Sequence, residues 1–293
     1  MSSRPSAPKS SETALWRPSR DEVSGLVEWS AFFAAWGFRG HWPAIADDPE
    51  QRDEALKLFR DAQDELARLE PDIRCVAAVL PANAVGEDVE IYASEARDEA
   101  RERFCFLRMQ RVRADGGPLY SLSDFVAPKS SGIPDWIGLF EVSVFGGTEA
   151  AAEARSRGDE YSALLRQLLF DRLAEAAAEW THRKTMSDLW GIGDGGPAVG
   201  IRPAPGYPAC PDHTEKAKIW SLLEVERNVG AKLTENYAIS PVSSVCGLMF
   251  AHPKSTYFGI GKIGRDQLAD YASRKGWTLD EARRWLAPSL DEE

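Results

Sequence analysis

Four of the chain's eighteen prolines lie in one segment, Gly200–Lys216, with the sequence GIRPAPGYPACPDHTEK. Each proline fixes its own φ near roughly −65° and biases the residue before it towards extended backbone, so this segment cannot form a helix or a regular central strand. Gly206 lets the chain turn or lets a ligand approach the backbone. Arg202 offers a planar fork of donors to an anion, and Tyr207 offers an amphipathic ring. The segment is therefore either a site for a small zwitterionic ligand or a plain loop that links a strand to a helix.

The composition of the chain argues against several classes of partner. Its 35 basic and 46 acidic residues give a formal charge of −11, which repels nucleic acid and anionic lipid. No window approaches the roughly 18 apolar residues of a membrane span, and the first twenty residues lack the apolar core of a secretory signal. We therefore expect a cytoplasmic protein with no nucleic-acid or membrane partner. The four cysteines are widely spaced in mostly apolar surroundings, which is typical of buried free thiols.

The apolar pattern predicts an α+β fold in one domain over residues 21–293. Residues 1–20 are rich in Ser, Pro and basic side chains without apolar periodicity, which predicts a disordered tail or linker. Strand-like runs follow one another along the chain, so we expect a mainly antiparallel sheet with flanking helices. The predicted helices are 21–38, 48–70, 149–190 with a break near Gly158, 211–230, 265–276 and 278–288; the predicted strands are 74–82, 88–94, 103–110, 135–147, 245–252 and 256–263.

Three motifs with catalytic or cofactor-binding precedents do not hold up. GIGKIG, at Gly259–Gly264, has the spacing of a dinucleotide fingerprint, but the residues after it read as two helices and not as the second strand that the fingerprint needs. Cys210 and His213 form a C-x-x-H without a second pair of ligands, so we expect no metal site. Scattered histidines and the absence of a G-x-S-x-G elbow leave a hydrolytic triad without support. We predict no catalytic acid, base or nucleophile.

Asp171 and Glu175, in FDRLAEAAAEW, lie four residues apart and therefore share one face of a helix. A solvated acidic face is the simplest interpretation of this pair. The alternative is a docking surface for a polar partner.

The proline-rich segment, read with the stretches around it, resembles a known family. GIRPAPGYPACPDHTEKAKIWSLLEVE is similar to the signature of the S-adenosylmethionine-binding activation domain of cobalamin-dependent methionine synthase. The resemblance continues upstream through EWSAFFAAWGF, LPANAVGEDVEIY, SLSDFVAPKSSGIPDWIGLF and DRLAEAAAEW, and downstream through AHPKSTYFGIGKIGRDQLADYASRKGWTLDEARRWLAP. It covers about Asp21 to Pro288.

The resemblance implies a C-shaped α+β domain that takes part in reductive reactivation of methionine synthase. Such a domain docks on a cobalamin-binding domain or core subunit, receives an electron from flavodoxin or an equivalent reductase, and presents the methyl group of S-adenosylmethionine to cob(I)alamin. Cobalamin would be carried by the partner, so this chain would not be catalytically complete alone. A sensor module that binds S-adenosylmethionine without methyl transfer, and a degenerate homologue that binds nothing, remain as alternatives.

The resemblance also implies particular site residues. Between DLWG and GIRPAPG the family usually has a further acidic helical segment, whereas only IGDGGPAV stands here, so one wall of the ligand site is expected to be trimmed. Glu28 stands where the family usually has Asp for the ammonium end of the ligand. Asp171 and Glu175 stand where the family places carboxylates that face the cobalamin domain. The implied S-adenosylmethionine-binding residues are Glu28, Arg202 for the carboxylate, Ala204, Gly206, Tyr207, Tyr257 and Phe258.

Overall fold

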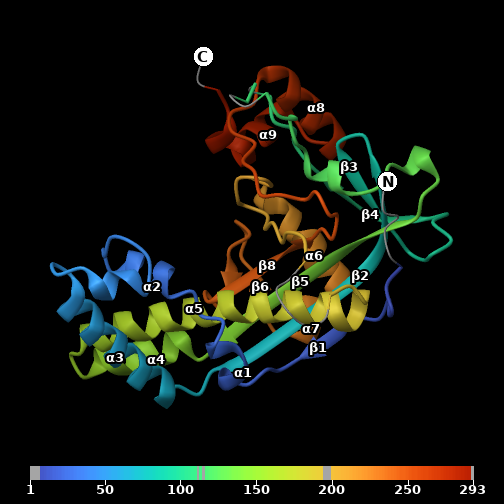
Figure 1. Cartoon of the computed structure of the whole chain (residues 1–293). Helices are drawn as coiled ribbons and strands as arrows, with labels where there is room; N and C mark the ends of the chain where they lie inside the picture. The colour runs from blue at the N-terminus through green and yellow to red at the C-terminus, as the bar shows by residue number, and fades with distance from the viewer. Residues whose placement is uncertain (1–6, 111, 114–115, 194–198, 292–293) are drawn as a thin grey trace.

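The structure, a computed structural model, describes residues 7–110, 112–113, 116–193 and 199–291. Within these ranges the chain forms an antiparallel sheet flanked by helices, as the α+β prediction requires (Figure 1). The strand order is β4-β3-β2-β5-β8, and β1 pairs with β2. The strands are β1 (Ala14–Trp16), β2 (Asp72–Val85), β3 (Asp88–Tyr92), β4 (Ala100–Cys105), β5 (Asp135–Phe145) and β8 (Ser244–Met249), with β6 (Lys232–Leu233) and β7 (Ile239–Ser240) in a separate hairpin.

The centre of the sheet is the antiparallel pair of β2 and β5, which stays in register over the whole of β5. Side chains of β5 alternate between the two faces of the sheet. Phe140 and Val142 belong to one hydrophobic cluster, and Ile137 and Leu139 belong to another. Both faces of β5 are therefore buried, which explains why its sequence is nearly continuous in apolar residues.

Helices cover both faces of this sheet. α5 (Glu160–Lys184) crosses one face and packs on β2, β5 and β8. Gly158, with a φ of +76°, separates α5 from α4, as the sequence predicts. α6 packs on the other face, against β2, β5 and β8, and α7 follows it. The remaining bounds are α1 (Arg20–Ser24), α2 (Trp29–Ala35), α3 (Arg52–Arg68), α4 (Gly147–Ser156), α6 (Lys216–Leu223), α7 (Val225–Asn228), α8 (Arg265–Lys275) and α9 (Leu279–Leu286).

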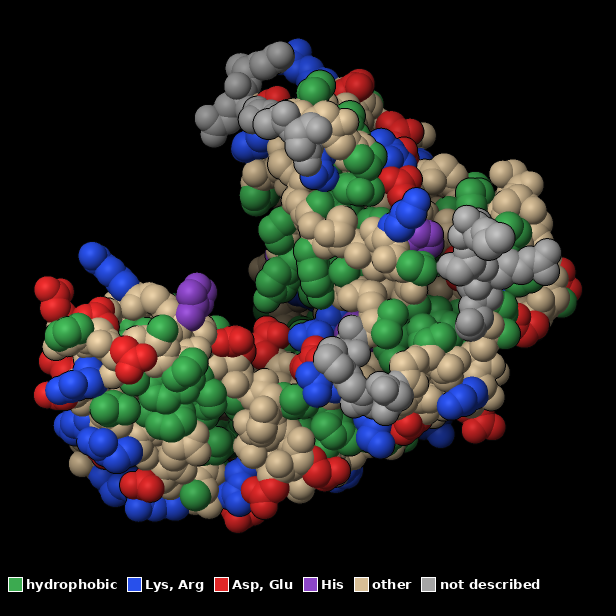
Figure 2. Space-filling view, in the orientation of Figure 1, with side chains coloured by type: hydrophobic (Ala, Val, Ile, Leu, Met, Phe, Trp, Pro, Cys, Tyr) green, Lys and Arg blue, Asp and Glu red, His purple; other side chains and the backbone are tan. Residues whose placement is uncertain are grey.

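The described residues have the C shape that the family resemblance implies. α2, α3 and α4 gather at one end of α5, whereas α8 and α9 lie at the other end of the molecule (Figure 1). The surface is deeply hollowed between these two parts (Figure 2). α8 and α9 contribute Leu268, Tyr271 and Leu286 to a separate small hydrophobic core, which also contains Cys105 and Ile263. The fold therefore offers an open concave face beside α5.

Two further findings concern the sequence-based expectations. All four cysteines are buried and free, as predicted. Among the described residues, we find no helix with the length and apolar character that a membrane span would need.

Some predicted element boundaries were wrong. The predicted tail ends too late, because Ala14–Trp16 pairs with β2 and Lys9 donates its backbone N–H to the carbonyl of Leu189 at 2.8 Å. The predicted helix over 21–38 is two helices, α1 and α2, with Glu28 as the N-cap of the second. The predicted strand over 256–263 is irregular: Gly261 has a φ of +71°, and the segment packs on the proline-rich loop instead of the sheet.

Candidate functional site

The proline-rich loop lies along the free edge of β8. Ile201 and Phe250 exchange backbone hydrogen bonds of 3.1 and 2.9 Å, and the N–H of Leu248 donates to the carbonyl of Pro203 at 2.9 Å. Pro203 has no N–H, so it can use this edge only as an acceptor. The close approach needs glycine in the strand, since a Cβ on Gly247 would lie 2.7 Å from the Pro203 oxygen. The loop is thus fixed to a central layer of the fold.

Beyond Pro203 the loop makes two tight turns. The N–H of Tyr207 donates to the carbonyl of Ala204 at 3.2 Å, and the N–H of Gly206 donates to the carbonyl of Cys210 at 2.7 Å. Gly206 has a φ of +95°, and a Cβ there would lie 2.3 Å from Cε1 of His213. Glycine is therefore required at this position both for its conformation and for the space beneath it.

The far end of the loop is held by two buried side chains of α8, Tyr271 and Lys275. Asp212 accepts hydrogen bonds from the hydroxyl of Tyr271 at 2.7 Å and the backbone N–H of Thr214 at 2.8 Å, and its carboxylate lies 2.9 Å from Nζ of Lys275. Burial alone would raise the pKa of Asp212, but the charge of Lys275 and these hydrogen bonds outweigh it and lower the pKa. Glu215, which is fully buried, also pairs with Lys275. These contacts fix where the loop passes into α6.

A cavity of about 520 Å³ opens between this loop, α5 and the segment after β8. Its volume lies within the range of small-molecule sites, roughly 300–1,000 Å³. The cavity combines apolar and aromatic walls with one cationic and one anionic side chain, Arg202 and Glu175. Its lining residues are Glu175, Arg202, Pro203, Ala204, Tyr207, Pro208, Ala209, Val245, Tyr257, Phe258 and Gly259.

Arg202 reaches the cavity from the loop and is held from behind by α5. Its Nη1 donates to Oε2 of Glu179, whose other oxygen, Oε1, accepts from Nε of Arg183 at 2.7 Å. Nη1 also lies 3.5 Å from Nδ1 of His182, a buried ring. Burial and the charge of Arg202 lower the pKa of His182 to about 4, so this ring is neutral at neutral pH. The guanidinium therefore has an anionic neighbour and a neutral one.

Aromatic side chains form the rim of the cavity. The hydroxyl of Tyr257 accepts the backbone N–H of Arg202 at 3.0 Å, which ties the two sides of the cavity together. Phe258 packs against Tyr120 and Phe125, with ring centroids 5.6 and 6.2 Å apart. Tyr207 and Tyr257 are nevertheless 59% and 61% exposed. Large exposed rings beside a cavity are well suited to contact a flat ligand.

The comparisons with known proteins decide the family. A family model described as vitamin B12 dependent methionine synthase, activation domain, matches residues 20–276. The chain belongs to this family. Among solved structures, the chain is similar to a crystal structure of the MetH reactivation domain bound to AdoHcy, with 40% sequence identity and a TM-score of 0.94. The match covers 99% of this chain and 94% of that chain.

The cavity of this activation domain brings together most of the residues that the sequence predicts for the ligand. Arg202, Ala204, Tyr207, Tyr257 and Phe258 all line it. They come from two segments about fifty residues apart, 202–207 and 257–258, which the edge pairing with β8 brings side by side. Their role in binding stays a prediction.

Two predicted ligand residues do not line the cavity. Gly206 shapes the turn beneath Tyr207, as described above. Glu28 is exposed and caps α2, where its Oε1 accepts from the backbone N–H of Ser30 at 2.8 Å. A role for Glu28 would need a ligand that extends from the cavity towards α2.

The predicted docking pair separates in the structure. Glu175 lines the cavity, whereas Asp171 accepts a hydrogen bond of 2.6 Å from the hydroxyl of Ser243, just before β8. Glu179, which the sequence analysis did not single out, stands four residues after Glu175 on the same helix face. The four-residue spacing could have placed Glu179 on this helix face, but not against Arg202.

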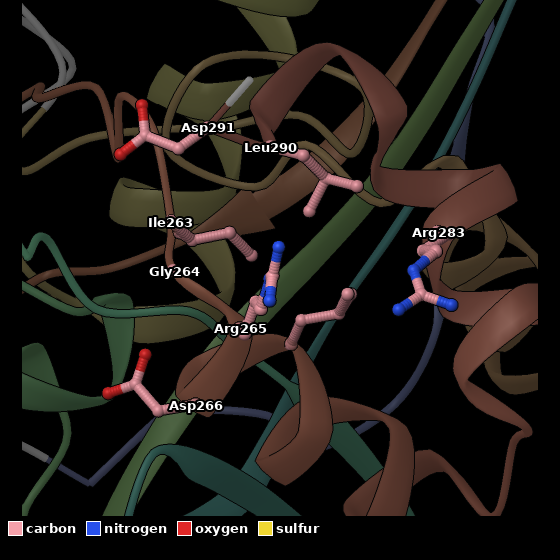
Figure 3. Close-up of a pocket in the computed structure, with 8 residues that line it drawn as sticks. Ile263, Gly264, Arg265, Asp266, Arg283, Leu290 and Asp291 are labelled. Atoms are coloured by element: carbon pink, nitrogen blue, oxygen red, sulfur yellow. The ribbon is translucent and has the colours of Figure 1, made fainter. Parts of the chain in front are cut away.

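A second cavity, of about 550 Å³, lies beside α8 and α9 and contains none of the predicted ligand residues. Figure 3 shows Arg265 extending between Ile263 and Leu290 in this pocket. Gly264, the last glycine of GIGKIG, is the N-cap of α8 here. No parallel strand follows it within the described residues, so the fold gives the motif no βαβ unit. The expectation of a trimmed wall concerns IGDGGPAV, of which residues 194–198 lie outside the described ranges.

Proposed function

We propose that this activation domain binds S-adenosylmethionine in the cavity between the proline-rich loop and α5, and presents its methyl group to a cobalamin held by a partner. The observation that carries the proposal is that Arg202 and Glu175 both line one aromatic-rimmed cavity. Membership of the activation-domain family and the similarity to a reactivation domain bound to AdoHcy support it.

The charges in the cavity complement the ligand. Nη1 of Arg202 is paired with Glu179, while its Nε and Nη2 have no partner among the described residues. That free edge of the guanidinium suits a carboxylate, which it can bind through two parallel hydrogen bonds. Glu175 offers a negative charge to the ammonium or sulfonium group. Tyr257 and Phe258 offer rings for the adenine, because aromatic faces pack well on a flat base.

The reaction requires little acid–base chemistry from the side chains of this protein. A sulfonium is already a good leaving group, and the partner's cobalamin supplies the nucleophile that accepts the methyl group. The contribution of the protein is to hold the methyl in line with its acceptor, an effect worth several kcal/mol. The loop suits this task because its path is fixed by prolines, by the β8 edge and by the Asp212–Lys275 contacts. The exposure of the rim leaves the cavity open to a docked partner.

The partners follow from the same proposal. The chain would act on a cobalamin-binding domain or core subunit of methionine synthase, with flavodoxin or an equivalent reductase as the electron donor. The domain would be incomplete alone, either as a separate subunit or as a module of a longer protein.

Calorimetric titration with S-adenosylmethionine and AdoHcy tests the binding site. We expect Arg202→Ala to weaken both ligands by about 10- to 100-fold, the value of a hydrogen-bonded charge pair. Arg227→Ala is the matched control, because Arg227 is exposed on α7 and, among the described residues, forms an ion pair with Glu224 alone, at 2.7 Å. Unchanged binding in the Arg202 variant would place the ligand elsewhere.

Reactivation is tested with a cobalamin-bearing methionine synthase core whose cobalt has been oxidised. Addition of this chain, a reductant and S-adenosylmethionine should restore turnover, and the Arg202→Ala variant should need more S-adenosylmethionine for the same recovery. Tight ligand binding without any recovery would instead support a sensor module.

A further inference from the structure

Glu179 lies behind the proposed carboxylate-binding arginine and makes no contact with the cavity itself. It is not among the residues that line the cavity, and its side chain is 22% exposed. One carboxylate oxygen accepts from Nη1 of Arg202, and the other accepts from Nε of Arg183, one turn along α5. A single carboxylate thus bridges a loop arginine and a helix arginine.

This bridge acts on the direction in which Arg202 points. An arginine side chain has many rotamers, and it loses this conformational freedom when it is fixed on a ligand. Because α5 is a rigid helix packed on the sheet, a hydrogen bond from Nη1 to Glu179 fixes one corner of the guanidinium plane. The edge formed by Nε and Nη2 then remains for a planar anion, with the orientation already set.

The charge balance around the arginine also favours this arrangement. Arg183 and Arg202 carry two positive charges and Glu179 carries one negative charge, so the group keeps a net charge of +1 for an incoming carboxylate. Burial would raise the pKa of Glu179, but the hydrogen bond from Arg183 and the charge of Arg202 lower it overall, which keeps it ionised at neutral pH. The neighbouring His182 is neutral and adds no competing charge.

We infer that Glu179 is a positioning residue for S-adenosylmethionine binding: it holds the Arg202 guanidinium so that its free edge meets the carboxylate of the ligand. The inference rests on the proposed function and adds a residue that does not touch the ligand. It also makes a statement about specificity, because the effect of Glu179 should be confined to ligands that carry a carboxylate.

Two ligands distinguish positioning from general structural support. AdoHcy has the amino-acid end, whereas 5′-methylthioadenosine has the nucleoside and the thioether without it. We expect Glu179→Gln, which keeps the shape and removes the charge, to weaken AdoHcy by about tenfold and to leave 5′-methylthioadenosine within about twofold. In an Arg202→Met background the same change should have no further effect on AdoHcy. Glu160→Gln, an exposed site on the same helix, is the control.

The outcomes separate this inference from the proposed function. If the parent protein does not bind AdoHcy, the proposed function fails. If the parent binds and Glu179→Gln binds AdoHcy equally well or more tightly, Glu179 is not a positioning residue. Equal weakening of both ligands would show general damage to the cavity and would also overturn the inference. If circular dichroism shows that Glu179→Gln is misfolded, Glu179→Asp, which keeps the charge with a shorter reach, is measured against the same two ligands.

Discussion

Several ionisable side chains of this domain are buried away from water. Glu141 stands at the centre of β5 and is fully buried. Its Oε1 accepts from the hydroxyl of Ser143, while Oε2 has no partner among the described residues. A carboxylate with one unpaired buried oxygen is costly when ionised, so this group favours its protonated form.

The buried carboxyl of Glu141 makes a prediction about stability and pH. Burial raises its pKa from 4.5 to about 8, against a smaller lowering by the Ser143 hydroxyl. Between these two values the folded state keeps a proton that the unfolded state has lost, so stability falls as the pH rises. Glu141→Gln cannot ionise. We expect the free energy of unfolding of this variant, relative to the parent, to increase between pH 5 and pH 8 by on the order of a few kcal/mol.

Urea unfolding of both proteins across this pH range measures the effect. Because other titrating groups are common to the two proteins, the difference between them reports on Glu141. Glu54→Gln, which changes an exposed carboxyl at the start of α3, is the matched control, and the pH dependence of Glu141→Gln should exceed that of this control. A constant difference for Glu141→Gln would mean that its carboxyl is ionised in the fold throughout.

At the element scale, the site depends on the edge between the proline-rich loop and β8. Gly247→Ala would place a methyl group 2.7 Å from the Pro203 oxygen and 2.9 Å from the ring of Phe140. The first is a backbone atom on a stiff loop and the second lies in the core, so neither can easily move. We expect a loss of stability of roughly 1–3 kcal/mol and a weakening of AdoHcy of about tenfold, because the loop is displaced from the edge.

The matched control for this edge is Gly25→Ala. Gly25 has a φ of −66° and no atom within 4 Å of an added Cβ, so the free energy of unfolding of the Gly25→Ala variant should differ from that of the parent by less than about 0.5 kcal/mol. Thermal unfolding and calorimetry measure the two effects separately. Unaltered ligand binding in the Gly247 variant would show that the loop does not need β8 to hold the ligand.

The same scale shows what local patterns could and could not predict. Apolar periodicity and helix-breaking residues act within a few residues of the chain. They suffice to predict the helix over 48–70, the break at Gly158 and the two closing helices. The sequence pattern of 256–263 looks like a strand because it is apolar, yet β8 has its free edge taken by Ile201–Pro203, and Gly261 turns the segment away. Which segment takes an edge is decided by distant parts of the chain.

Some residues of the candidate site can likewise be predicted from the sequence, whereas others cannot. Arg202 and Tyr207 could be singled out from the chemistry of their own segment, and Tyr257 and Phe258 from the family resemblance. Glu179 could not be chosen from α5 alone, because nothing in its local sequence says that Arg202 lies against that turn of the helix. The contact exists only once α5 and the loop are packed on one sheet.

At the scale of the whole molecule, the acidic side chains of α5 can contact either the ligand or a docked partner. Glu175 lines the cavity, so a change there should affect ligand and partner together. Asp171 does not line the cavity and is held by Ser243. The two carboxylates can therefore be tested apart, although they share a helix face.

Asp171→Lys reverses the charge at the site that the family resemblance predicts to face the cobalamin-bearing partner. Reversing one charge of a complementary interface brings like charges together, which slows association and weakens binding, so we expect the concentration of core needed for half-maximal reactivation to rise by roughly tenfold. AdoHcy affinity should stay within about twofold of the parent, whereas Glu175→Gln should weaken both. Glu54→Lys gives the same change of net charge away from α5 and controls for long-range effects. If Asp171→Lys weakens AdoHcy as strongly as it weakens reactivation, Asp171 acts through the ligand site and is not a separate docking residue.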